Sequence, residues 1–207
     1  MVVYCEMTRR FYPQHRQRRR QRLVFLSVGC LFIILLGLGC WFYWRRRSAP
    51  VWETWTNDSL GFSLQYPSNF VARPLSEQAK EAGYILELRR QNPNALFSVR
   101  FEEGLGPLKI LGGSVFEALV AEVNRRYPDR FPDYRKEKYE EIVLANEKAG
   151  LFEFTYTGAD GKTRVRQRFV LVVKDENAYY LSFQAPQKEF FKSEEDFDKI
   201  IQSFEFL

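Results

Sequence analysis

Residues 151–185, LFEFTYTGADGKTRVRQRFVLVVKDENAYYLSFQA, decide the fold because they contain three strand patterns in succession, separated by short turns. Asp160 and Gly161 predict a two-residue hairpin turn, in which the numbers of opposed residues sum to 321. Polar side chains then face polar ones and apolar side chains face apolar ones: Thr157 with Arg164, Thr155 with Arg166, Glu153 with Arg168, Tyr156 with Val165, and Phe152 with Phe169. A slip of one residue would destroy this agreement, so the sequence predicts this antiparallel register.

The second of these strands changes character along its length. Arg164, Arg166 and Arg168 form a stripe on one face, whereas residues 169–173 are apolar at every position. A strand that is apolar on both sides is covered on both faces of its sheet, which predicts a layer above and a layer below. The arginine stripe has two interpretations: it binds an anion, or it pairs across strands with Glu153 and neighbouring acids.

Alternating patterns before this segment predict two more hairpins. One joins residues 53–56 to residues 62–66, and the other joins residues 84–90 to residues 96–103. The first turn contains Asn57-Asp58-Ser59, which is formally a glycosylation acceptor, but a turn rich in Asn, Asp and Ser needs no such explanation.

Two segments have helical periodicity. Residues 113–127 predict a helix with Ser114 and Glu117 as a capping box, and the following residues 124–141 are interpreted as a loop broken by prolines. A last helix begins near Ser193, with Asp196 in position to complete a second capping box. We expect this helix to pack on the sheet and to bury Phe197, Ile200, Ile201 and Phe204.

Residues 23–44, LVFLSVGCLFIILLGLGCWFYW, contain no charged side chain and are bracketed by arginines. As a helix they reach about 33 Å, enough to cross a hydrocarbon core of about 30 Å. We therefore expect residues 1–22 to form a basic cytoplasmic tail, residues 23–44 a transmembrane helix, residues 45–51 a linker and residues 52–207 the folded domain. Lipid attachment at Cys40 stays open, although no leucine stands three residues before it.

The charge distribution predicts the orientation in the membrane. Seven arginines precede the span and three follow it, which favours a cytoplasmic N-terminus. The chain is then a single-pass protein of an inner or thylakoid-type cell membrane, with its C-terminal domain on the extracytoplasmic side. Residues 48–207 hold 21 basic and 25 acidic side chains, so we expect the folded domain to bind no nucleic acid.

Several chemistries are excluded because residues 52–207 contain neither histidine nor cysteine. Ser-His-Asp and Cys-His catalysis and the usual zinc sites all need one of these residues. The glycines do not follow Rossmann or P-loop spacing either. We therefore expect no cofactor and no enzymatic activity, with hydrolysis by two carboxylates as the remaining catalytic alternative.

One group of residues mixes arginine with aromatic side chains, the composition that is enriched at protein interfaces. The alternative is a solvated loop whose rings pack into the core. As candidate partner-binding residues we take Arg125, Arg126, Tyr127, Arg130, Phe131, Tyr134 and Arg135.

Three segments in order, GFSLQYPSNF at 61–70, AYYLSFQAP at 178–186 and IIQSFEF at 200–206, resemble the PsbP-like family. This family includes the extrinsic subunit of photosystem II and bacterial membrane-anchored or lipoprotein relatives. The resemblance covers residues 52–206 and implies an α+β fold, an antiparallel β-sheet sandwiched by helices. It also implies a non-enzymatic accessory role at a membrane, and it transfers no site residues, because no histidine is present for a family metal site.

These observations together predict an accessory or assembly subunit that binds a larger membrane protein complex on its extracytoplasmic face. The alternative is an extracytoplasmic solute- or lipid-binding module. That alternative requires a deep apolar pocket between helix and sheet.

Overall fold

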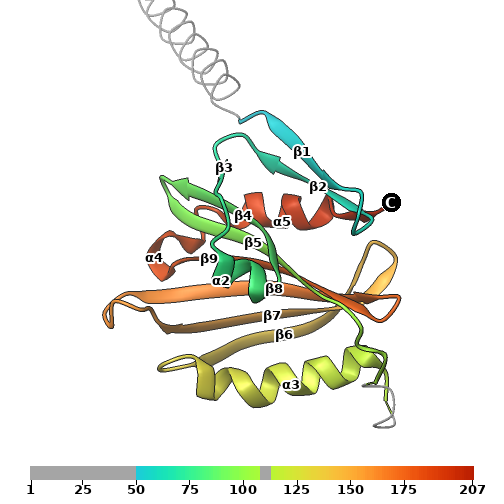
Figure 1. The fold of residues 1–207 in the computed structure, drawn as a ribbon. Helices are drawn as coiled ribbons and strands as arrows, with labels where there is room; N and C mark the ends of the chain where they lie inside the picture. Colours follow the sequence, from blue (N-terminus) through green and yellow to red (C-terminus); the bar gives the residue numbers. More distant parts are fainter. Residues whose placement is uncertain (1–49, 108–112) are drawn as a thin grey trace, which may run out of the picture. The chain divides into compact units, whose positions relative to one another are not determined.

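The computed structural model describes residues 50–107 and 113–207, which form a seven-stranded antiparallel sheet between two further layers (Figure 1). In spatial order the strands are β3 (Val71–Ala72), β4 (Tyr84–Gln91), β5 (Asn94–Glu102), β9 (Asn177–Pro186), β8 (Arg164–Lys174), β7 (Glu147–Thr157) and β6 (Arg135–Leu144). The predicted β4–β5 hairpin and β7–β8–β9 meander are present in this sheet, and the other predicted hairpin, of residues 53–56 and 62–66, forms outside it.

The two faces of this sheet are covered by different elements. Helix α3 (Val115–Arg130) lies on one face. The other face is covered by α4 (Gln187–Phe190), α5 (Glu194–Gln202) and a small sheet of β1 (Trp52–Asn57), β2 (Phe62–Pro67) and β10 (Glu205–Phe206). The short helix α2 (Glu77–Glu81) follows β3. The α+β class is confirmed, but the first hairpin contributes to one covering layer, whereas the family resemblance implies helices on both faces.

Strand β8 carries an apolar cluster on each side. Val170 and Val172 belong to the cluster under α5 and the small sheet, whereas Phe169 and Leu171 belong to the cluster under α3. All four side chains are buried. The prediction that this half-strand is covered on both faces is confirmed.

The β7–β8 register is the predicted one, with Glu153 opposite Arg168, but the turn is wider than two residues. The strands end at Thr157 and Arg164, and residues 158–163 connect them. The Asp160 carboxylate accepts hydrogen bonds from the backbone N–H groups of Lys162 and Thr163, at 2.9 and 2.8 Å. The register is unchanged because the loop of residues 158–163 is centred between Asp160 and Gly161, as the predicted two-residue turn is.

The interpretation of residues 124–141 as a loop is wrong. Helix α3 continues through Pro128 to Arg130, and β6 begins at Arg135. Pro128 lies in the last turn, so the hydrogen bond that its missing N–H cannot donate, and any kink at its ring, affect only the end of the helix. Strand β6 was missed because it is the edge of the sheet, where charged side chains face solvent and hide the alternating pattern.

The predicted capping box is present at the start of α3 but not at the start of α5. Ser114 and Glu117 form the predicted capping box of α3. Ser193 is the N-cap of α5, but its hydroxyl accepts a hydrogen bond from the buried Arg90, and Arg90 also donates to Asp196 at 2.6 Å. The second capping box is therefore wrong. The predicted apolar residues of this segment are buried: Phe197, Ile200, Ile201 and Phe204.

No helix within residues 50–107 and 113–207 is long and apolar enough to span a membrane. The predicted tail and transmembrane helix, and residues 45–49 of the predicted linker, lie outside the described residues. In the first turn, the side-chain oxygen of Asn57 accepts hydrogen bonds from Ser59 and from the backbone of Leu60, as expected of a structural turn.

Candidate functional site

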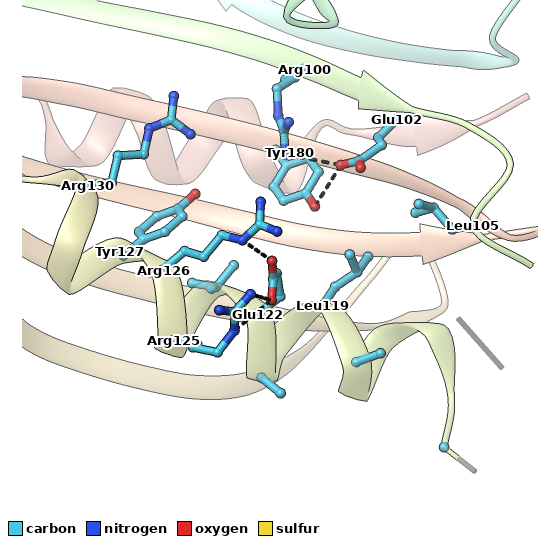
Figure 2. A pocket seen from close by; sticks show the side chains of 14 residues that line it. Arg100, Glu102, Leu105, Leu119, Glu122, Arg125, Arg126, Tyr127, Arg130 and Tyr180 are labelled. Atoms are coloured by element: carbon cyan, nitrogen blue, oxygen red, sulfur yellow. Dashed lines mark hydrogen bonds and ion pairs between the residues drawn. The ribbon is translucent and has the colours of Figure 1, made fainter. Parts of the chain in front are cut away.

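A cleft of about 680 Å³ lies between α3 and the strands β5 and β9 (Figure 2). It forms because α3 packs over β7 and β8 and leaves the ends of β5 and β9 open on the same face. Figure 2 shows Arg126, Tyr127 and Arg130 rising from α3 toward Arg100 and Tyr180 of the strands. Arginine and tyrosine therefore dominate the rim of this cleft.

The strand side of the cleft is held together by one compact group. Arg100 on β5 is opposite Tyr180 on β9, and its guanidinium lies over the Tyr180 ring at 4.0 Å from the centroid. Glu102 pairs with Arg100 at 3.3 Å and accepts the Tyr180 hydroxyl at 3.2 Å. Burial raises the pKa of Tyr180 well above its ordinary value, so the phenol stays neutral at physiological pH.

The helix side carries three arginines but one acid. Arg125 and Arg126 both form ion pairs with Glu122, Arg125 at 2.8 Å, and the hydrogen bonds from Arg125 lower the pKa of Glu122. The Cζ atom of Arg130 lies 5.8 Å from the centroid of the Phe131 ring. Within the described part of the chain, no acidic side chain forms an ion pair with Arg130.

Tyr127 stands between these two groups. Its ring packs against Phe131, Phe154 and Phe169, with centroids 5.3 to 5.5 Å apart, which fixes its orientation. Burial raises the pKa of Tyr127, and the positive charges of Arg100 and Arg130 act in the opposite direction. The hydroxyl is thus a neutral donor that lies within electrostatic reach of two guanidinium groups.

The cleft is locally basic within an acidic domain. Four arginines and two glutamates line it, an excess of two positive charges. Residues 48–207 as a whole carry four more acidic than basic side chains. A cleft of this kind favours ligands that present negatively charged groups.

The structure divides the predicted partner-binding residues into two groups. Arg125, Arg126, Tyr127 and Arg130 line the cleft. The rings of Phe131 and Tyr134 pack against Phe154 in the aromatic cluster under α3, with ring centroids 5.1 and 5.2 Å from that of Phe154. Arg135 is exposed on β6.

No pattern in the sequence indicates that Arg100, Glu102 and Tyr180 line the cleft. They reach it through the β5–β9 pairing, which brings together Arg100 and Tyr180 although about 80 residues separate them in the sequence. Only knowledge of the strand order would have revealed them.

The arginine stripe of β8 takes part in a network of polar contacts. Arg166 and Arg168 donate their Nε–H groups to the two oxygens of the buried Glu153, at 2.7 and 2.6 Å. Arg164 donates to Thr155 at 2.6 Å and to the backbone oxygen of Asp133. These are the cross-strand contacts that the second interpretation of the stripe describes. No group of three or more metal-ligating side chains gathers within residues 50–107 and 113–207.

Solved structures identify the class of the fold as PsbP-like. The solution structure of CyanoP, the cyanobacterial PsbP of Synechocystis sp. PCC 6803, has a TM-score of 0.56 at 12% identity, covering 77% of this chain and 94% of that chain. LpqN of Mycobacterium tuberculosis, a protein involved in cell envelope biogenesis, has a TM-score of 0.51 at 14% identity, covering 77% and 92% of the two chains. The family resemblance expected from the sequence is confirmed at the level of the fold.

A family model gives the narrower assignment. The model described as the serine/threonine kinase C-terminal domain matches residues 54–206, and the chain belongs to this family. No curated protein sequence matches it.

Proposed function

We propose that this chain is a single-pass membrane protein whose extracytoplasmic PsbP-like domain is a non-enzymatic accessory or assembly subunit of a larger membrane protein complex. In this proposal the partner binds at the cleft between α3 and the β5 and β9 strands. The observation that carries it is Arg130, which forms no ion pair with an acidic side chain of the described residues and stands beside the fixed ring of Tyr127 at the rim of an open cleft. Arginine and tyrosine in such positions are the anchors most often found at protein interfaces.

The chemistry of the cleft supports binding rather than catalysis. Its two acids are both engaged, Glu122 by two arginines and Glu102 by Arg100 and Tyr180. A carboxylate that is held by guanidinium groups is a poor general acid or base at neutral pH. The charged rim also differs from the deep apolar pocket that a lipid-binding module needs.

The relatives are compatible with an accessory role. PsbP and the cell-envelope protein LpqN share the fold. The family description refers to a C-terminal domain of serine/threonine kinases, which fits a module that adds binding capacity to a separate activity. The predicted span at residues 23–44 would keep such a module next to partners in the same membrane.

Co-purification of the full chain from native membranes tests the proposal. We expect Arg126→Glu with Arg130→Glu to reduce retention of the partner, because both substitutions reverse the charge at the rim. Lys188→Glu with Lys192→Glu changes the net charge equally at exposed positions around α4, on the opposite face of the sheet. Equal retention by both double variants would contradict the proposal.

A further inference from the structure

The cleft follows α3 along most of its length, which sets the size of the ligand. Its lining runs from Gly113 to Arg130. At about 1.5 Å per helical residue this is about 25 Å, a distance that an extended peptide covers with about eight residues. A small anion would occupy only one end of such a cleft.

The lining has two chemical zones. Leu119 and Val123 are each 6% exposed and, together with Leu105, form an apolar floor. Arg126 and Arg130 stand at the rim above this floor (Figure 2). A peptide in extended conformation presents alternate side chains to opposite sides, so apolar residues can reach the floor while acidic residues meet the rim.

The charges favour a peptide over a polyanion or a membrane surface. The excess of two positive charges in the cleft matches two carboxylates. The surrounding domain is acidic overall, which disfavours the close approach of an anionic bilayer or a nucleic acid. An acyl chain would need a continuous apolar channel, and Glu102 and Glu122 interrupt the lining.

We infer that the cleft binds an extended polypeptide segment of about eight residues in which acidic side chains alternate with apolar ones. This inference rests on the proposed function, since the segment would belong to the membrane partner. Arg126 and Arg130 pair with its carboxylates, and the Tyr127 hydroxyl donates a hydrogen bond to it. Leu119 and Val123 contact its apolar side chains.

Fluorescence anisotropy of the full chain in zwitterionic nanodiscs tests this inference. The probe is a fluorescein-labelled octapeptide of alternating glutamate and leucine, and the control probe is alternating lysine and leucine. We expect the acidic peptide to bind and the basic peptide to bind at least tenfold more weakly. Arg126→Glu with Arg130→Glu should weaken binding of the acidic peptide about tenfold, because two attractive pairs become repulsive ones.

Two further variants separate binding from folding. Lys188→Glu with Lys192→Glu should leave the affinity within about twofold of the wild type, because α4 is remote from the cleft. Tyr127→Phe keeps the packed ring and removes the hydroxyl, which should weaken binding about fivefold. Circular dichroism of each variant checks that it is folded.

The outcomes distinguish this inference from the proposed function. Equal binding of the two peptides, or full binding by the Arg126→Glu, Arg130→Glu variant, would overturn the inference. Arginine-dependent capture of vesicles containing anionic lipid, without peptide binding, would overturn it in favour of a membrane surface. If the partner co-purifies through the cleft but the peptide does not bind, the proposed function stands and the inference falls. Peptide binding without any co-purifying partner would support the peptide site and contradict the proposed function.

Discussion

Replacing Glu153 by glutamine tests whether the polar network between β7, β8 and α5 stabilises the domain. Glu153 is 3% exposed and accepts hydrogen bonds from Arg166 and Arg168 at 2.7 and 2.6 Å. Arg168 extends the network to α5 through Glu194 and through Asp198, the latter at 3.1 Å. Glutamine keeps the shape of the side chain, removes its charge and turns a donor toward an arginine.

The expected loss of stability depends on which partners Arg166 and Arg168 keep in the Glu153→Gln variant. Removing one member of a buried ion pair costs about 3–5 kcal/mol. Arg168 keeps Glu194 and Asp198, whereas Arg166 is left with the rings of Phe190 and Phe191. We therefore expect a loss near the lower end, about 3 kcal/mol. For a domain of this size that corresponds to a fall in Tm of about 6–12 °C.

Thermal unfolding of the full chain, followed by circular dichroism, measures this loss. The matched control is Glu77→Gln, because the Glu77 side chain is 83% exposed and pairs with Lys80 on the same short helix. The control should leave Tm unchanged within error. A fall of less than about 2 °C in the Glu153→Gln variant would refute the argument that this network stabilises the domain.

Two other predictions concern turns. Gly83 and Gly61 both have positive φ, +82° and +64°, but a Cβ at Gly83 would lie 2.5 Å from a backbone oxygen, while Gly61 has open space. We expect Gly61→Ala to cost about 1 kcal/mol in urea unfolding and Gly83→Ala at least about 1 kcal/mol more, and equal costs would contradict this. Hydrogen bonds from the Thr163 hydroxyl and from nearby backbone N–H groups lower the pKa of Asp160 from its ordinary 3.8 to about 2. Its contribution to stability is therefore complete above pH 3.8 and is lost as the pH falls through about 2, so an NMR titration of this carboxyl with a midpoint near 3.8 would contradict the turn geometry.

Local pattern predicted most of the sheet. The alternation on β7 and β8 fixed the register of Glu153 against Arg168, because only one pairing keeps polar and apolar faces apart. It did not predict the width of the turn, since the side-chain hydrogen bonds of Asp160 compete with the two-residue geometry. Edge strand β6 carries too many solvent-facing charges to show a period.

The cleft could be predicted only in part. Arg126, Tyr127 and Arg130 are close in sequence, and their composition indicated an interface. The strand side depends on long-range pairing, which brings Arg100 beside Tyr180 and which no local signal encodes. The doubly apolar half of β8 predicted a layer on each face of the sheet, and the family resemblance implied the α+β class. Neither predicted that the first hairpin covers one face.

Site-specific photo-crosslinking in native membranes is the most direct test of the central claim that the domain binds a membrane partner at the cleft. A photoreactive amino acid is placed at Arg125, whose side chain is 68% exposed at the cleft, or at Lys199 on the opposite face of the sheet, 51% exposed. We predict one discrete adduct with a membrane protein from position 125, weakened by Arg130→Glu, and none from position 199. The same adduct from both positions, or no adduct from position 125, would contradict the claim.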